Sequence, residues 1–390
     1  MTVSAAARPG LATAAPIVVI AVFGITLGIT YPLLALLLEQ RGLPRGVIGA
    51  NGAMTPLGMV VSAPLIPRLV RVVSPWRAMA AASVAIAVLL AVLAGSDDLA
   101  LWFVVRFAVG SCAVTMFVLG ETWISEAAAG PRRGQLLTAY TSVMALGFAV
   151  GPAVMAVAGD GSLVPLVVAV ACSLLAVVPL WAARARVPRM VSSGAIPVRG
   201  LLARLSVLLL AVVSVAVFDG VTLQFLPAYV LGEGLSPRLA ALALTVLLVG
   251  QVLFQYPLGW LADRIGPRRA LVLSLSAGAA GALALPWAVE VPWLFWPLVA
   301  VWGGLAFAGY PLALTILGDG LKGAGLLLGN TAFAIVWGLG GIAGPPYSGV
   351  AIDWLGPAGM PLSLATIWLL ALAVIAVARF RTPGTVGAHR

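Results

Sequence analysis

The sequence predicts an all-α integral membrane protein with twelve transmembrane helices in two pseudo-symmetric six-helix bundles. Three observations support this. Of the 390 residues, 62% are hydrophobic and 9% are charged, and the mean hydropathy is +1.13. This balance leaves too little polar surface for a soluble chain of this length. Twelve apolar stretches are each about long enough to cross a bilayer, and the two halves of the chain share motifs in the same order.

The twelve apolar stretches predict helices because of their length. A spanning helix needs about 20 apolar residues, whereas the strands of an outer-membrane barrel alternate over about ten residues. Together the stretches use most of the chain, so no separate soluble domain is expected. They lie at about 15–38, 46–66, 78–95, 99–122, 135–158, 162–182, 205–231, 238–261, 269–289, 292–318, 326–350 and 359–380.

The basic residues indicate how the chain is oriented. Eighteen of the 22 Lys and Arg residues fall in the tails and in the loops on the side of the termini, three fall in the opposite loops, and Arg106 lies within a span. By the positive-inside rule both termini of this multi-pass protein are therefore cytosolic. The abundance of Gly, Ala and Arg with a single Lys is typical of a bacterial protein, so the predicted location is the inner (cytoplasmic) membrane of a bacterium. The net charge of +10 does not indicate nucleic-acid binding, because no basic run is combined with aromatic stacking residues.

The segment 183–204 divides the chain into two halves. It carries five Arg residues and no apolar period, which is typical of a cytosolic linker. The predicted organisation is a cytosolic N-terminal tail, a first bundle, the linker, a second bundle and a cytosolic C-terminal tail, in a chain expected to be a monomer. Their ranges are 1–14, 15–182, 183–204, 205–380 and 381–390.

Glycine and proline recur at matching places in the two halves. Gly147, Gly151 and Pro152 in the fifth span are matched by Gly340, Gly344 and Pro345 in the eleventh. Gly120-Glu121 and Gly318-Asp319 likewise end the fourth and tenth spans. Proline removes a backbone hydrogen bond and glycine allows close approach of another helix. The glycines and prolines of the fifth and eleventh spans are therefore candidate gate kinks, with tight helix packing as the alternative.

The loop between the eighth and ninth spans carries a recognisable motif. Residues 259–269 read Gly-Trp-Leu-Ala-Asp-Arg-Ile-Gly-Pro-Arg-Arg. This segment resembles the Gly-x-Leu-Ala-Asp-Arg-x-Gly-x-Arg-Arg signature of the major facilitator superfamily. The resemblance covers the whole chain and implies secondary transport by alternating access. Glu121-Thr122-Trp123 also resembles the Glu-Ser/Thr-Trp signature of a bacterial branch of that superfamily.

Three further features belong to this resemblance. The first-half copy of the loop signature is poorer, because Pro67 and Arg71 stand where Gly and Asp are expected. Arg106-x-x-x-Gly110 looks like the superfamily's arginine motif of the fourth span. The Gly-Pro element of the fifth span resembles one associated with drug/proton antiporters, although its flanking glycines are missing and it recurs in the eleventh span.

The loop motif suggests a cytosolic latch. Asp263 can cap a neighbouring helix and hold Arg264 or Arg268, with Asp319 as a further partner of these arginines. Glu121 is expected to pair with Arg71 or Arg77, or alternatively to carry protons. A plain positively charged loop is the other interpretation. The latch residues are Gly259, Asp263, Arg264, Gly266, Arg268, Arg269, Asp319, Arg71 and Arg77.

Arg106 and Asp219 are charged residues deep inside apolar spans, where a charge usually marks a pathway, a relay or an ion pair. At about 1.5 Å per residue, each lies about 10 Å from the outer surface. In the superfamily the fourth and seventh spans line the central cavity. The prediction is that the two residues face each other there and that their separation lets Asp219 take a proton. A static ion pair is the alternative.

Polar and aromatic residues within the spans are candidates for lining a substrate site. A pocket that combines aromatic groups with few charges suits a flat or amphipathic organic molecule. Ordinary helix packing is the alternative for each residue. The candidates are Tyr31, Tyr140, Gln224, Tyr229, Gln251, Gln255, Trp302, Tyr310, Asn330, Phe333 and Trp337.

The leading functional hypothesis is proton-coupled secondary transport of a small organic solute, with efflux by antiport. Proton symport of an aromatic or vitamin-like nutrient and a membrane sensor that does not transport are the alternatives. An enzyme is not expected, because the single His is His389 and no catalytic triad, metal-ligand cluster or phosphate-binding loop is present. No cofactor or metal is expected. The partners are the lipid bilayer, the solute and protons.

Overall fold

The computed structural model describes residues 9–43, 45–128, 133–158, 164–188 and 198–378. Every regular element in this part of the chain is a helix. Most of the predicted N-terminal tail, the middle of the predicted linker and the predicted C-terminal tail lie outside the described residues.

The first half of the chain forms six crossings. They are made by α1 (Pro9–Gln40), by α2 (Arg45–Ser62) continued through η1 (Ala63–Leu65) into α3 (Ile66–Val72), by α4 (Pro75–Ala94), by α5 (Leu99–Ala127), by α6 (Arg133–Ala158), and by α7 (Val164–Leu175) continued into α8 (Val177–Ala182). A short helix, η2 (Arg184–Arg186), follows at the start of the predicted linker.

The second half forms six more. They are made by α9 (Val198–Gly232), by α10 (Pro237–Ile265), by α11 (Pro267–Ala288), by α12 (Pro292–Phe307) continued into α13 (Gly309–Gly320), by α14 (Gly323–Leu355), and by α15 (Gly359–Ala378), which follows η3 (Gly356–Ala358). α9 begins seven residues before the predicted seventh span, inside the segment assigned to the linker.

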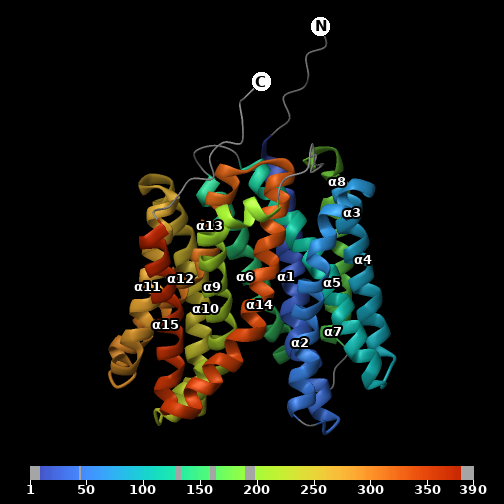
Figure 1. Ribbon diagram of the computed structural model, residues 1–390. Coiled ribbons are helices and arrows are strands. Elements are labelled where there is room, and N and C mark those ends of the chain that lie inside the picture. The colour runs from blue at the N-terminus through green and yellow to red at the C-terminus, as the bar shows by residue number, and fades with distance from the viewer. Residues whose placement is uncertain (1–8, 44, 129–132, 159–163, 189–197, 379–390) are drawn as a thin grey trace.

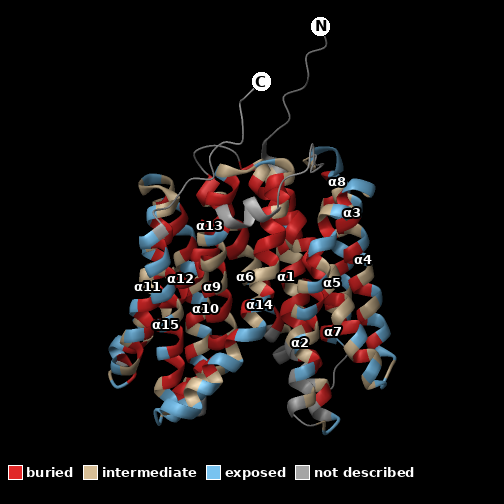
Figure 2. Cartoon of the chain, viewed as in Figure 1, coloured by how far each residue is buried: buried red, intermediate tan, exposed pale blue. Residues whose placement is uncertain are grey.

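The all-α, twelve-crossing prediction is confirmed for the described residues. Eleven continuous apolar stretches are long enough to span a membrane, and the last of them, Gly323–Val377, contains both α14 and α15. Large apolar side chains are exposed on the outside of the bundle, among them Trp293, Trp354 and Val377 at 78%, 82% and 86%. Such a surface suits lipid, and buried residues lie where helices face one another (Figure 2).

Local sequence explains where several helices begin and end. The carboxylate of Asp98 accepts a hydrogen bond from the backbone N–H of Ala100 at 2.9 Å and so caps α5. The hydroxyl of Ser236 caps α10 in the same way. Between α10 and α11 the chain turns at Gly266, whose φ of +91° is a conformation that favours glycine.

Helices from each half of the chain pack mainly with one another (Figure 1). In the first half α1 packs on α6 and α2 on α5, and in the second half α9 packs on α14 and α10 on α12. Because successive crossings alternate in direction, α5, α10 and α13 end where α6 and α14 begin. We call this the Asp263 end, and the opposite end, where Arg41 pairs with Asp97 at 2.6 Å, the Arg41 end.

The matching glycines make close contacts within each half. A Cβ placed on Gly151 of α6 would lie 2.0 Å from the carbonyl carbon of Gly28 in α1, and one on Gly147 would lie 2.5 Å from the carbonyl oxygen of Ala21. Gly340 and Gly344 of α14 contact α9 in the same manner. The first and fifth crossings therefore pack as the seventh and eleventh do. The contacts match tight packing, while a gate role for these residues stays a prediction.

We expect Gly151→Ala to destabilise the protein, because its methyl group meets backbone atoms of α1 that cannot yield without moving the helix. Overpacking of this kind typically costs about 1–3 kcal/mol. The matched control is Gly341→Ala in α14, where an added Cβ meets nothing within 4 Å. Thermal unfolding in detergent should show a lower midpoint for Gly151→Ala only. Equal midpoints for the two variants would contradict the close contact.

Candidate functional site

Asp263, at the end of α10, caps a helix of the other half. Its two carboxylate oxygens accept hydrogen bonds from the backbone N–H groups of Gly134 and Gln135, the first residues of α6, at 3.0 and 3.3 Å. A carboxylate is stabilised at a helix N-terminus by the unpaired N–H groups and by the helix dipole. Arg264 does not join this contact, because its guanidinium stacks 3.6 Å from the Trp260 ring centre.

Arg133 forms a second connection at the same end. Its guanidinium donates to Asp319 of α13 at 2.7 Å and to the backbone carbonyl of Ser125 in α5 at 2.7 Å. Asp319 therefore pairs with Arg133, and Arg264, which stacks on Trp260, is not its partner. A contact between Asp319 and Arg268 stays a prediction. Arg133 begins a helix that packs on both halves, whereas the exposed Arg264 lies on the outer surface of α10.

Glu126 forms a third connection, which the sequence analysis missed. Its carboxylate accepts a hydrogen bond at 2.5 Å from the backbone N–H of Gly323, the first residue of α14. Two helices that begin at the Asp263 end, α6 and α14, thus each meet a carboxylate from the opposite half. The sequence did offer a signal for this contact: Glu126 lies close to the end of one span, and Gly323 begins a later one.

Glu121 lies deeper, between α5 and α13. It is 2% exposed, and its carboxyl accepts a hydrogen bond from the Tyr310 hydroxyl. The expected pairing with Arg71 or Arg77 is wrong, because both arginines are exposed on the first half and Tyr310 is the one described residue that bonds the Glu121 side chain. The second oxygen of the carboxyl has no hydrogen-bond partner among the described residues.

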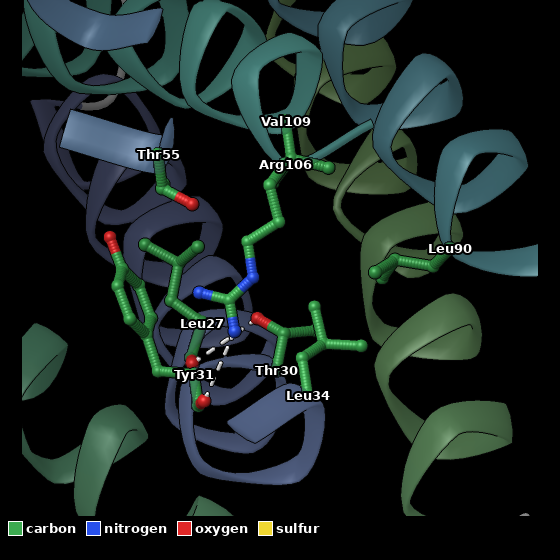
Figure 3. A pocket seen from close by; sticks show the side chains of 8 residues that line it. All are labelled: Leu27, Thr30, Tyr31, Leu34, Thr55, Leu90, Arg106 and Val109. Atoms are coloured by element: carbon green, nitrogen blue, oxygen red, sulfur yellow. Dashed lines mark hydrogen bonds between the residues drawn. The ribbon is translucent and has the colours of Figure 1, made fainter. Parts of the chain in front are cut away.

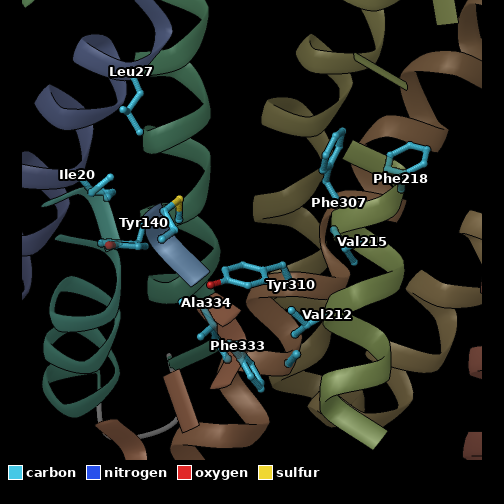
Figure 4. Packing of buried hydrophobic residues seen from close by; sticks show 14 of the residues in the cluster. Ile20, Leu27, Tyr140, Val212, Val215, Phe218, Phe307, Tyr310, Phe333 and Ala334 are labelled. Carbon is cyan, nitrogen blue, oxygen red and sulfur yellow. The ribbon is translucent and has the colours of Figure 1, made fainter. Parts of the chain in front are cut away.

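Aromatic residues of both halves pack near this carboxyl, and Figure 4 shows three of them, Tyr140, Tyr310 and Phe333. The Tyr310 ring packs edge-on against Trp337 of α14 at 4.9 Å and lies 6.3 Å from Phe333. From the first half, the Tyr140 hydroxyl abuts Gly120 and makes no hydrogen bond to a described residue. Several of the predicted lining residues therefore meet at Glu121. We call Glu121, Tyr140, Tyr310, Phe333 and Trp337 the Glu121 cluster.

Two further polar contacts join the halves. The side-chain amide of Asn330 donates to the Thr122 hydroxyl at 2.8 Å. The side-chain carbonyl of Gln255 accepts from the hydroxyls of Thr141 and Ser142 at 3.1 and 3.2 Å. Every hydrogen bond between described residues of the two halves lies within about ten residues of the Asp263 end, which is about 15 Å along a helix. That depth is about half of a hydrocarbon core.

Arg106 and Asp219 do not form the expected ion pair. Arg106 is 4% exposed and points toward α1, where it donates to the Tyr31 carbonyl at 3.4 Å and lies 5.8 Å from the Tyr31 ring centre (Figure 3). Asp219 of α9 is partly buried and pairs with no described cation. Both charges are close enough to Tyr31 to act on it electrostatically.

Other predicted lining residues lie away from the contact between the halves. Trp302 is buried inside the second half, where its indole N–H donates to the Gly278 carbonyl at 2.9 Å and its ring packs on Phe218. Tyr229 is buried near Glu233 and Glu290, toward the Arg41 end of the second half. Gln224 is exposed and Gln251 is partly exposed. The described residues contain no cluster of His, Cys, Asp and Glu that could hold a metal ion.

Comparison with known proteins identifies relatives over most of the chain. The family model described as Major Facilitator Superfamily matches residues 17–244 and 208–390. The uncharacterized MFS-type transporter YfkF of Bacillus subtilis is 22% identical over 365 residues, which is 90% of this chain and 93% of that protein. An uncharacterized MFS-type transporter of Yersinia pseudotuberculosis is 24% identical over 83% of this chain and 84% of its own length.

Solved structures share the fold at low sequence identity. A bacterial homologue of the iron transporter ferroportin in an outward-facing state has a TM-score of 0.78 at 11% identity, covering 96% of this chain and 99% of its own. The transporter FucP in the outward conformation has a TM-score of 0.77 at 15% identity, covering 92% of this chain and 97% of its own. These likenesses establish the arrangement of the helices.

We expect Asp263→Asn to weaken the contact between the halves at the Asp263 end, because a neutral amide interacts less with the α6 N-terminus. A carboxylate there contributes about 0.3–2 kcal/mol, which corresponds to about a two- to thirtyfold shift in population. Spin labels at Val72→Cys and Arg269→Cys, in a background with Cys112 and Cys172 replaced by Ser, would report the distance between the halves. Arg264→Gln is the control, since Arg264 stacks on its own helix. A shift of equal size in both variants would contradict the capping role.

Proposed function

Because this chain belongs to the major facilitator superfamily, we propose that it transports a small organic solute by alternating access and exports it in exchange for protons. The chain is a multi-pass membrane transporter, and two bundles that meet at one end suit a carrier that opens to one side at a time. The aromatic Glu121 cluster suits a flat or amphipathic solute.

The Asp263 end is proposed to face the cytosol. Eighteen basic residues lie in the tails and in loops on this side, against three on the other. With the polar contacts between the halves confined to this side, the conformation corresponds to an outward-facing carrier in the inner membrane of a bacterium. The outward-facing states of the two similar solved structures support the same reading.

The observation that carries the proton coupling is the environment of Glu121. The carboxyl is buried between the halves, it meets a tyrosine hydroxyl, and no described cation pairs with it. A charged carboxylate without a partner is costly in such a place, so the neutral, protonated form is favoured while the halves are joined. Separation of the halves admits water, and the carboxyl can then release its proton on the cytosolic side.

Asp219 is the second proposed proton site. It lies on α9 without a described counter-ion. Protonation of Asp219 would respond to the pH on the side of the membrane that the Arg41 end faces. Two acids at different depths could hand a proton from the outer to the inner side during one cycle.

The direction of transport is proposed from the Gly-Pro element of α6. It resembles an element of drug/proton antiporters, and in this chain it sets the close contact between α1 and α6. Everted membrane vesicles with an acidified lumen would test the direction after a thermal-shift screen of metabolites and drugs has supplied a solute. Export by antiport predicts accumulation of the solute together with loss of the pH gradient. Uptake into right-side-out vesicles that are acidic outside would instead identify a symporter, and binding without flux a sensor.

We expect Glu121→Gln to abolish the pH dependence of opening at the Asp263 end. In the unchanged protein the joined state should be favoured at low pH and should give way as pH rises, since only the open state accommodates the carboxylate. The amide is neutral at every pH, so the halves should remain joined. The spin-label distances from Val72→Cys and Arg269→Cys, measured between about pH 5 and 9, provide the readout.

Asp353→Asn is the control for this measurement, because Asp353 is exposed at the end of α14 far from the Asp263 end. It should keep the pH response of the unchanged protein. Retention of that response in Glu121→Gln would show that another group couples protons to opening, and Asp219→Asn would then be the next variant.

A further inference from the structure

We propose that Arg106 binds an anionic group of the transported solute and that the solute is therefore an organic acid, a carboxylate in the simplest case. This inference rests on the proposed transport function and adds the chemical class of the substrate. It begins with the electrostatics of one buried guanidinium.

Arg106 is a buried cation with no counter-ion in the part of the chain that the structure describes. It is 4% exposed, and its only hydrogen bond among described residues is the 3.4 Å contact to the Tyr31 carbonyl. Its Nε atom is buried without a partner. The arginines that form ion pairs in the described residues, Arg41 and Arg133, bond their carboxylates at 2.6 and 2.7 Å. Burial without such a partner is unfavourable, so the site is built for an anion that is not part of the chain in this conformation.

The guanidinium faces a small cavity (Figure 3). Leu27, Thr30, Tyr31 and Leu34 line it from α1, Thr55 from α2, Leu90 from α4, and Arg106 and Val109 from α5. The enclosed part of this cavity holds about one water molecule, and the space around it, open solvent included, is about 260 Å³. A carboxylate can accept two parallel hydrogen bonds from a guanidinium, and apolar walls strengthen that interaction because they exclude water.

A neighbouring helix offers further polar groups. Thr55 lines the cavity, and Asn51 lies one turn away on the same face of α2. Asn51 is fully buried, and neither atom of its amide has a hydrogen-bond partner among the described residues. An unpaired amide and a guanidinium on packed neighbouring helices are typical of a site that is completed by a ligand.

The position of Arg106 fits a solute that enters from the Arg41 end. It lies seven residues into α5, about 10 Å from that end, whereas the hydrogen bonds between the halves lie toward the Asp263 end. Tyr31, whose backbone carbonyl accepts from Arg106, has its ring 6.3 Å from that of Phe148. This aromatic pair offers apolar surface to the body of a solute whose acid group reaches Arg106.

Binding of aromatic acids to the purified full-length protein tests the proposal. Benzoate, salicylate and indole-3-acetate are the probes, and their neutral amides are the matched ligands. Titration calorimetry should show that each acid that binds does so about tenfold or more tightly than its amide. Arg106→Gln should remove that preference, and Arg106→Lys should weaken it, because an ammonium lacks the planar fork of donors.

Arg41→Gln is the control variant, since it removes an arginine from an exposed ion pair at the Arg41 end and should leave the preference intact. If none of the three acids binds the unchanged protein better than its amide, the proposal is overturned, and this result does not require any variant to fold. Acid binding that persists in Arg106→Gln also overturns it.

Failure of this proposal is distinguishable from failure of the proposed function. Arg106→Gln should retain the pH-dependent opening at the Asp263 end, because Glu121 governs that step. Loss of acid preference with retained pH response confirms the anion site. An unchanged protein that lacks the pH response but still prefers acids would contradict the coupling mechanism and leave the anion site standing.

Discussion

Polar groups inside a bilayer must find their partners within the protein, because hydrocarbon offers them none. In this chain that requirement determines where the two halves meet. Glu121, Thr122 and Gln255 each accept a hydrogen bond from the opposite half, and carboxylates cap helices of the opposite half. Apolar helices gain little from associating with one another in lipid, so these contacts decide which end of the bundle is joined. A carrier that alternates must break them together.

The two halves meet that requirement with different residues. Asp263 of the loop signature caps α6, and the corresponding position of the first half is Arg71, which cannot accept a hydrogen bond. The α14 N-terminus nevertheless meets a carboxylate, because Glu126 reaches it from the end of α5. The poorer first copy of the signature therefore does not leave the Asp263 end without a second cap. The two halves thus share the position of a carboxylate at a helix N-terminus, although the residue that supplies it differs.

The sequence predicts the helices well because hydrophobic length and glycine spacing are local properties. The matching Gly-x-x-x-Gly elements of α6 and α14 indeed contact α1 and α9. Rotation about the helix axis is not local. Counting residues gives the depth of Arg106, but only packing shows that its side chain turns toward Tyr31 and not toward Asp219. Likewise Trp302 lies on a helix that is apolar on all sides, so its inward direction into the second half could not be read from its neighbours in sequence.

Arg106 and Glu121, which have no counter-ion among the described residues, differ in how they can be neutralised. A carboxyl group such as Glu121 becomes neutral by taking a proton, so burial against Tyr310 makes its charge depend on whether the halves are joined. A guanidinium remains charged in proteins, so Arg106 needs an anion. Asp219 could supply one in another conformation, but it would then compete with an acidic solute for the same group. That competition would make release of the solute depend on the ionisation of Asp219, which links the site of binding to the site of protonation without direct contact between solute and proton.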